Sequence, residues 1–153
     1  MIPGTLARRL AAGLLDALIL TPPSLAVLFL TGERWALTPM AVLLIAALDL
    51  VYRAGFEASG WRATPGKRLL GLAVTTLDGG GLGLARAILR TLPFWGGTLI
   101  ALLSPATGRP EFTALAWLAA PACLLWLPFA GWRRALHDVW AGAVVGPAAG
   151  PPP

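Results

Sequence analysis

The chain has 153 residues, of which 57% are hydrophobic and only 12% are charged, and its mean hydropathy is +0.73. Soluble domains carry about 25% charged residues, so this composition excludes an ordinary soluble protein and predicts one membrane-embedded domain. The net charge of +5 would favour nucleic acid as a partner only if the basic residues formed a face on a soluble fold. Here they lie between apolar segments, so no nucleic-acid partner is expected.

The first apolar segment, residues 10–30, has the length of about 20 residues that a membrane-spanning helix needs. It is interrupted by Asp16 and by the sequence TPPS at positions 21–24, where the prolines are expected to kink the helix. A basic start followed by an apolar run also occurs in secretory signal peptides. This run is longer than a signal peptide needs and has a poor cleavage site, so it is predicted to be a membrane span.

The second predicted span covers residues 36–52 and carries Asp49 near its end. Asp49 and Arg53 are four residues apart, which places them one turn apart on the same face of a helix. We expect them to form an ion pair near the membrane interface.

The connection from residue 57 to residue 90 reads EASGWRATPGKRLLGLAVTTLDGGGLGLARAILR, and any soluble chemistry would have to lie there. It does not match a phosphate-binding loop, because five residues instead of four separate Gly60 from Gly66, and Lys67 is followed by arginine. Residues with high strand propensity run into Asp78 and Gly79, a pair typical of tight hairpin turns. A short hairpin is therefore predicted here.

A short amphipathic helix is predicted to follow the hairpin. Arg86 and Arg90 lie one turn apart, on a face opposite Leu84, Ile88 and Leu92, as in helices that lie in the membrane interface. This basic stripe has two interpretations that the sequence leaves open. It is either a solvated surface that touches anionic lipid headgroups or a site for a partner or ligand.

Two further spans are predicted, at residues 88–104 and 113–132. The first is marginal, because only residues 92–103 are free of charge and Arg90 would have to extend toward the headgroups. The second has no charged residue and carries three tryptophans suited to the membrane interface, Trp117, Trp126 and Trp132. Residues 1–146 are expected to form the single domain, and the Pro/Gly/Ala-rich residues 147–153 are predicted to be disordered.

The basic residues predict the orientation of the spans. Ten of the twelve fall on one side of the predicted spans, and only Arg34 and Arg109 fall on the other. By the positive-inside rule, both termini and the long connection are expected in the cytoplasm. The chain is thus predicted to be a multi-pass protein of a bacterial-type inner membrane.

Asp16 lies inside the first predicted span, and Arg9 precedes it by seven residues, about two turns and ~10 Å along one face. A charged side chain near the centre of a span costs about 2.5 to 3.5 kcal/mol, so it is expected to face other helices or water rather than lipid. Two roles remain open: a buried hydrogen-bond acceptor that holds helices together, or a site that takes up a proton or cation.

His137 and Asp138 follow the last predicted span. Neighbouring residues on a helix point about 100° apart and no nucleophile is arranged nearby, so the pair does not predict a catalytic dyad. One histidine and one cysteine, Cys123, are too few for a zinc site or a disulfide. We therefore expect no enzymatic activity, metal or cofactor, and we expect Arg133 or Arg134 to satisfy the pair.

Three sequence features occur in a recognisable order: Arg9 with Asp16 seven residues later, then TPGKRLLGLAV followed by DG and RAILR, then LHDVWAGAVV. In this order and spacing the chain resembles the RDD family of membrane proteins over nearly its whole length. The resemblance implies that the family's arginine and two aspartates are Arg9, Asp16 and Asp138, and it implies ion or small-solute transport as the suspected activity. The chain departs from the family pattern at Ala143, where a threonine is usual.

These observations predict an all-α membrane protein with four transmembrane helices, whose cytoplasmic connection holds a short hairpin and an interfacial amphipathic helix. The leading hypothesis is a role in ion or small-solute transport, in which Arg9, Asp16 and Asp138 converge on one polar site. Supporting candidates for this site are His137, Asp49, Arg53, Lys67, Arg86 and Arg90. The alternative is a structural or accessory subunit whose polar residues only pack helices or dock a partner. Expected partners are the anionic headgroups of the bilayer and a second copy or larger membrane protein.

Overall fold

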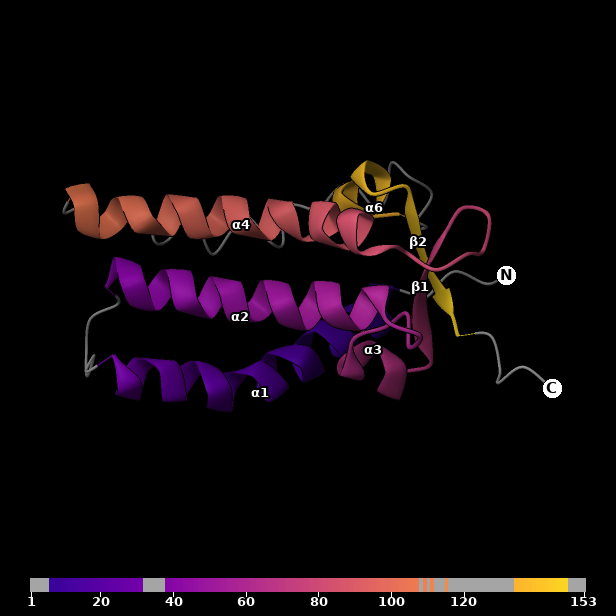
Figure 1. Ribbon diagram of the computed structural model, residues 1–153, viewed down its shortest axis with the longest axis horizontal. Coiled ribbons are helices and arrows are strands. Elements are labelled where there is room, and N and C mark those ends of the chain that lie inside the picture. Colours follow the sequence, from indigo (N-terminus) through magenta and orange to yellow (C-terminus); the bar gives the residue numbers. More distant parts are fainter. Residues whose placement is uncertain are drawn as a thin grey trace.

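Three long helices lie side by side and form the body of the protein (Figure 1). In this computed structural model they are α1 (Leu6–Leu30), α2 (Pro39–Ala58) and α4 (Leu84–Thr107), with α2 in the middle. The structure describes residues 6–31, 38–107 and 134–148, together with positions 109, 111 and 115.

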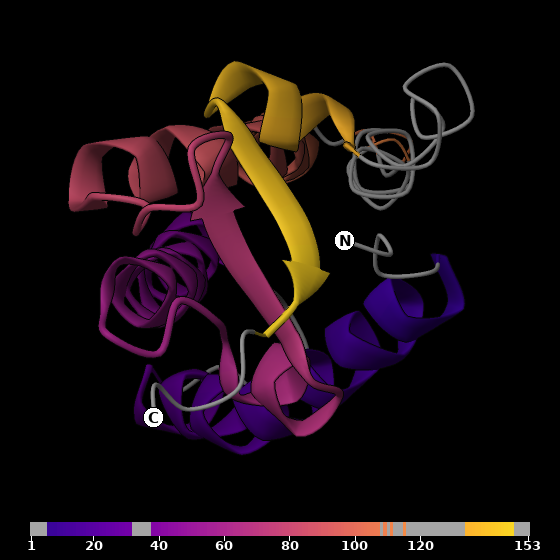
Figure 2. The same cartoon turned by 90° about the vertical axis from the view of Figure 1, so that its right-hand side faces the viewer.

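The shorter elements gather at one end of the three long helices (Figure 1). They are the helices α3 (Pro65–Leu69) and α6 (Leu136–Trp140) and the strands β1 (Leu72–Thr76) and β2 (Ala143–Pro147). The strands pair in antiparallel register with Val74 opposite Val145, and Figure 2 shows them lying across this end. Because the connection after α2 and the segment after α4 meet in one sheet, residues far apart in the sequence come together here.

α1 continues through Pro22 and Pro23, and it changes direction part-way along its length (Figure 1). Each proline lacks the N–H that a helix would donate to the carbonyl four residues earlier, and its ring crowds that carbonyl. The kink expected from the sequence is therefore present in the helix.

α2 starts where its sequence provides a cap. The hydroxyl of Thr38 accepts a hydrogen bond from the N–H of Ala41 at 3.3 Å, and Pro39 occupies the first helical position. The helix continues to Ala58, beyond the predicted end at residue 52. Glu57 therefore belongs to the helix rather than to the connection.

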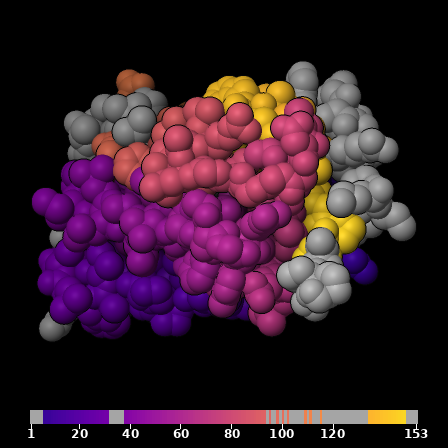
Figure 3. Space-filling view, turned by 45° about the vertical axis from the view of Figure 1, so that its right-hand side comes forward, coloured from indigo at the N-terminus to yellow at the C-terminus, as the bar shows by residue number. Residues whose placement is uncertain are grey.

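The helices α1 and α2 are long and apolar enough to cross a membrane, judged by length and composition. Little of either helix is buried inside the protein, and large apolar side chains such as Leu14, Leu18, Phe29 and Val51 are exposed. Figure 3 shows α1, α2 and α4 packed against one another on one face. An outer surface of this kind suits lipid better than water.

α4 differs from the prediction. A single helix from Leu84 to Thr107 replaces the separate interfacial helix and the span that was predicted to start at residue 88. The sequence LARAILRTL consists mostly of residues that favour helix, and Pro93 is accommodated within it. The fourth predicted span, residues 113–132, lies outside the described residues except for position 115.

The predicted hairpin is wrong, although its turn is present. Gly79 has a φ of 80°, and the N–H of Thr76 donates to the carbonyl of Gly80 at 3.0 Å. The residues after the turn, GGLG, have little strand propensity, so β1 pairs with β2 instead. β2 ends at Pro147, and the N–H of Ala148 donates to the carbonyl of Gly71 at 2.8 Å. Ordered structure thus reaches two residues into the tail that was predicted to be disordered.

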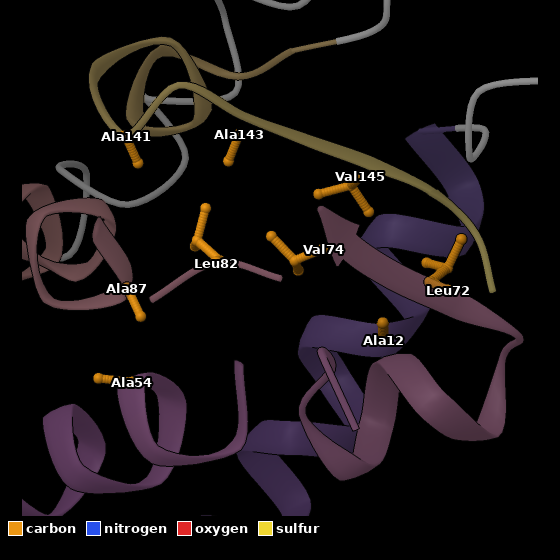
Figure 4. Close-up of a cluster of buried hydrophobic side chains, with 9 residues drawn as sticks. All are labelled: Ala12, Ala54, Leu72, Val74, Leu82, Ala87, Ala141, Ala143 and Val145. Atoms are coloured by element: carbon orange, nitrogen blue, oxygen red, sulfur yellow. The ribbon is translucent and has the colours of Figure 1, made fainter. Parts of the chain in front are cut away.

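A small apolar core lies where the strands meet the helices (Figure 4). It is made mostly of alanines, and its members are Ala12, Ala54, Leu72, Val74, Leu82, Ala87, Ala141, Ala143 and Val145. Small side chains allow the helices to approach one another closely. This close approach brings side chains from α1, α2, α3, α4 and α6 within hydrogen-bonding reach.

Candidate functional site

Five charged side chains from five elements meet at the end of the helices that carries the strands. We call them the charged cluster: Arg9 of α1, Glu57 of α2, Lys67 of α3, Arg90 of α4 and Asp138 of α6. Each of the two carboxylates in the cluster contacts two of the three cations. Because every member comes from a different element, the cluster forms only when the whole fold is assembled.

Asp138 accepts hydrogen bonds at both carboxylate oxygens and is completely buried. Arg90 Nε donates to Oδ1 at 2.7 Å, and Arg9 Nη1 donates to Oδ2 at 3.2 Å. The N–H of Ala135, just before α6, also donates to Oδ2 at 3.0 Å. Burial alone would raise the pKa of Asp138, but Arg90 above all, together with Ala135 and Arg9, holds this pKa well below its usual range. Asp138 is therefore an ionised carboxylate held by two arginines, and the predicted contact between Arg9 and Asp138 is present.

Glu57 is the second carboxylate of the cluster, and only 1% of it is exposed. Arg90 Nη1 donates to its Oε1 at 2.5 Å, and Lys67 Nζ donates to the same oxygen. Within the described part of the chain, Oε2 has no hydrogen-bond partner. Burial lowers the pKa of Lys67, and the Glu57 carboxylate acts in the opposite direction. Arg90 thus bridges Glu57 and Asp138 and connects the two halves of the cluster.

Asp16 is also completely buried, but it accepts from uncharged donors. Tyr52 Oη donates to Oδ1 at 2.8 Å, and the hydroxyl of Thr64 donates to Oδ2 at 2.6 Å. The N–H of Gly66, in the first turn of α3, donates to Oδ1 at 2.8 Å. The carboxylate therefore satisfies one of the N–H groups that the start of a helix leaves without an internal partner. Asp16 ties α1 to α2 and α3.

Gly66 is required where α3 meets α1. A Cβ at this position would lie 2.5 Å from the carbonyl oxygen of Ala12 and 2.7 Å from Oδ1 of Asp16. Both distances are too short for a carbon atom, and a backbone carbonyl cannot easily move away. In the sequence TPG, the threonine thus provides a hydroxyl for Asp16, the proline starts α3, and the glycine allows α3 to approach α1 closely.

His137 lies beside the cluster and is 7% exposed. Its Nε2 is 3.4 Å from Oδ1 of Asp138. Burial, and after it the positive charge of Arg90, lower the pKa of His137 to about 3, against the opposing effect of Asp138. His137 is therefore neutral at physiological pH and adds no charge to the cluster.

Two predictions about individual side chains are confirmed and two are corrected. Arg53 Nε donates to both oxygens of Asp49 at 2.7 and 2.9 Å, which is the predicted ion pair one turn apart. Arg86 is exposed, as predicted, but Arg90 is buried between Glu57 and Asp138 instead of lying on a basic stripe. The periodicity of α4 alone could not show that residues of α2 and α6 cover Arg90.

Arg134 is the second correction. Arg133 or Arg134 was expected to satisfy the pair of His137 and Asp138. The guanidinium of Arg134 donates to backbone carbonyls instead of the carboxylate, at 3.0 Å to Ala143 and 3.2 Å to Asp138. Arg9 and Arg90 already occupy the carboxylate from the other side. The alternative partner, residue 133, lies outside the described residues.

A cavity of about 460 Å³ lies against the charged cluster. All five members of the cluster line it, together with Asp16, Arg53 and His137. Thr91 and a set of apolar residues complete the lining: Leu10, Gly13, Leu14, Leu72, Ala135 and Val145. Among the described residues, no group of three or more histidine, cysteine, aspartate or glutamate side chains is placed to hold a metal ion. The cavity is therefore lined by both charged and apolar residues and is suited to a small polar or amphiphilic solute.

Glu57 and the three partners of Asp16 were not predicted from the sequence. Glu57 lies four residues after Arg53, on the same face of α2, but the predicted end of that span at residue 52 placed it in the connection. The sequence TPGK does carry a signal, because threonine followed by proline is typical of a helix start. What the sequence could not show is that this start faces Asp16.

The sequence model of the RDD family matches residues 3–142. The chain belongs to the RDD family. Together with the apolar helices α1 and α2, this membership identifies it as a membrane protein. Comparisons with curated proteins and with solved structures found no match. Two of the three residues attributed to the RDD pattern, Arg9 and Asp138, are directly bonded, and the third, Asp16, lines the same cavity.

Proposed function

We propose that this RDD protein takes part in moving an ion or small solute across the membrane, and that the cavity beside the charged cluster is the place where the solute binds. The observation that carries the proposal is the cavity itself, about 460 Å³ in volume and lined by all five members of the cluster. Ionisable side chains near membrane-spanning helices are expensive to desolvate, and they commonly mark the path of an ion or substrate.

The chemistry of the cluster suits exchange of partners. Arg90 contacts two carboxylates, and each carboxylate contacts two cations, so these three members do not depend on a single ion pair. An arriving charged group could replace one of these contacts while the displaced side chain keeps another. In this proposal Arg9 and Asp138 form the polar end of the site. Asp16 has the first of the two roles left open by the sequence, a buried acceptor that fixes the cavity wall.

We also propose four spans with both termini in the cytoplasm of a bacterial-type cell. The start of α1, the connection between α2 and α4, and β2 all lie at one end of the long helices (Figure 1), which supports placing them on one side of the membrane. Ten of the twelve basic residues belong to this side. Under the positive-inside rule that side faces the cytoplasm, and the cavity opens from it or lies close to it.

The experiment for the transport proposal is a flux measurement in proteoliposomes with an imposed pH or cation gradient. Asp138→Asn removes one charge from the cluster and keeps the shape of the side chain, so it should abolish flux in a protein that still folds. Asp49→Asn is the matched control, because Asp49 pairs with Arg53 in a partly exposed position and does not line the cavity. Wild-type flux in the Asp138 variant would reject the cluster as the transport site.

A second function is supported by a different observation. The charged cluster and Asp16 cross-link α1, α2, α3, α4 and α6, which is what a structural or accessory subunit would need to hold its shape. For this alternative, reconstituted wild-type protein should give no flux with any tested gradient. A larger membrane protein should then co-purify with it in mild detergent, and this complex should survive Asp138→Asn as long as the variant folds.

A further inference from the structure

We infer that the cavity binds an oxyanion, a phosphate or carboxylate group, that carries an apolar portion. Arg9, Lys67 and Arg90 would hold the oxyanion, and Leu10 and Leu14 of α1 would contact the apolar portion. The inference rests on the proposed function, since it names the class of solute for the same cavity. It reverses the expectation, drawn from Asp16 alone, that the solute is a proton or cation.

The first support is the charge balance of the cluster. Three cations, Arg9, Lys67 and Arg90, share two carboxylates, so the bonded cluster has one positive charge in excess. His137 does not change this balance, because burial keeps it neutral. Asp16 lines the same cavity but accepts from uncharged donors instead of from these cations. A bound anion would bond directly to the cations and stabilise their buried charge.

The other carboxylates of the chain do not bond to the three cations in the described residues. The chain has seven acidic residues in all. Asp16 accepts from Tyr52, Thr64 and Gly66, and Asp49 pairs with Arg53. Asp78 and Glu111 are exposed, and residue 33 lies outside the described part. Among the described residues, the carboxylates bonded to the three cations are therefore Glu57 and Asp138.

The second support is the shape of the donor set. The planar guanidinium groups of Arg9 and Arg90 carry forked N–H donors that match two oxygens of a phosphate or carboxylate, and Lys67 adds a compact cation. These cations already hold the carboxylates of Glu57 and Asp138, so an oxyanion would take the place of one of these carboxylates. Their side chains are only 6% to 13% exposed, so an anion bound here would be held away from most of the solvent. Ion pairs in such a position are screened less than surface pairs.

The third support is the apolar part of the cavity lining. Leu10, Gly13 and Leu14 come from one face of α1, and Leu72 and Val145 come from the two strands. These side chains offer no hydrogen bond to a bare inorganic ion. They would contact an alkyl or acyl portion, so an amphiphile is expected to bind more tightly than its headgroup alone.

The same chemistry has two sources, an anionic lipid of the bilayer or a soluble organic acid or phosphate. Calorimetric titration of the full chain in a neutral detergent tests the shared chemistry with two probes, inorganic phosphate and hexyl phosphate. Both should bind, hexyl phosphate at least about tenfold more tightly because of its alkyl chain.

A second titration, of the protein in lipid nanodiscs, separates the two sources. If a lipid headgroup is the ligand, hexyl phosphate should bind more weakly in nanodiscs of anionic phospholipid than in nanodiscs of zwitterionic lipid. If a soluble acid or phosphate is the ligand, binding should be equal in both.

Three variants test the residues. Lys67→Met removes one cation and should weaken hexyl phosphate binding by about tenfold or more, the usual loss for a hydrogen bond to a charged group. Glu57→Gln removes a competing carboxylate and should strengthen binding. A folding defect cannot imitate this gain, so the test holds even if Lys67→Met fails to fold. Arg86→Gln, which removes an exposed cation that does not line the cavity, should leave binding unchanged.

The inference is overturned if neither probe binds the wild type, if Glu57→Gln weakens binding, or if Arg86→Gln weakens it as much as Lys67→Met. Binding is measured here without flux, which keeps the two proposals separate. Oxyanion binding without any flux would reject the transport proposal and keep this site. Cation flux without oxyanion binding would reject this inference and keep the transport proposal.

Discussion

Gly66→Ala is the substitution whose effect the structure predicts most directly. The new Cβ would lie 2.5 Å from the carbonyl oxygen of Ala12 and 2.7 Å from Oδ1 of Asp16. Forcing a methyl group into a packed site costs about 1 to 3 kcal/mol, and displacing Asp16 also weakens the 2.8 Å hydrogen bond from the Gly66 N–H. A hydrogen bond to a charged group contributes about 1.5 to 3 kcal/mol. Allowing for partial relaxation, the loss in free energy of unfolding should be about 3 to 5 kcal/mol.

The assay is reversible unfolding in mixed micelles, followed by circular dichroism as the fraction of denaturing detergent is raised. Gly55→Ala is the matched control, because a Cβ at Gly55 meets nothing within 4 Å and the residue lies inside α2. This control should be neutral or more stable by about 0.5 to 1 kcal/mol, since alanine favours helix over glycine. If Gly66→Ala is as stable as the wild type to within about 0.5 kcal/mol, the packing of α3 against Asp16 is wrong.

Three further predictions follow from the same contacts. Asp16→Asn places an amide N–H₂ among donors from Tyr52, Thr64 and Gly66, so unfolding experiments should show a loss of about 2 to 4 kcal/mol; unchanged stability would remove Asp16 from its structural role. The pKa of His137, the only histidine, is lowered by burial to about 3 in the folded protein, so the unfolded chain binds an extra proton below about pH 6.5. Stability should therefore be complete above that pH and fall by up to about 1.4 kcal/mol per unit toward pH 4, and His137→Gln should flatten this dependence. Cysteine labelling, with Cys123 first replaced by serine, should reach position 60 from the cytoplasmic side and position 32 only from the opposite side; labelling of both from one side would contradict the proposed topology.

Much of the fold follows from the sequence because the relevant signals are local. The length of the apolar run around Asp16 predicts α1, and the prolines at positions 22 and 23 predict its bend. The spacing of Asp49 and Arg53 on one helix face predicts their ion pair. In each case the residues that make the interaction lie within one element, so periodicity and spacing are sufficient.

The errors concern partners that lie far away in the sequence. The high strand propensity of β1 was correct as a strand signal, but its partner strand lies about seventy residues later, and no turn signal could identify it. Arg90 has the spacing of a solvated residue on α4, yet Glu57 and Asp138 cover it. Glu57 was missed for the same reason. Nothing in the neighbouring sequence distinguishes a buried carboxylate near a helix end from an exposed one.

For the candidate site, too, some contacts were predicted from the sequence and others were not. The position of Arg9 at the start of the first helix and of Asp138 after the last one placed both at one membrane face, and their contact was predicted on that basis. Asp16 was expected to join them, but it bonds instead to Tyr52, Thr64 and Gly66. A helix face tells which residues share a direction, whereas the neighbours in that direction depend on packing of the whole fold.

The central claim is that a solute passes through the cavity beside the charged cluster, and filling that cavity tests it most directly. Gly13 lines the cavity, and a Cβ there meets nothing within 4 Å, so Gly13→Leu places an apolar side chain in the open space without changing any charge. Leucine also favours helix over glycine, so α1 should form at least as well. In proteoliposomes under the gradient that the wild type dissipates, Gly13→Leu should lose most of the flux, while Gly55→Leu, outside the cavity, keeps it. Wild-type flux through a folded Gly13→Leu protein would show that the solute does not use this cavity.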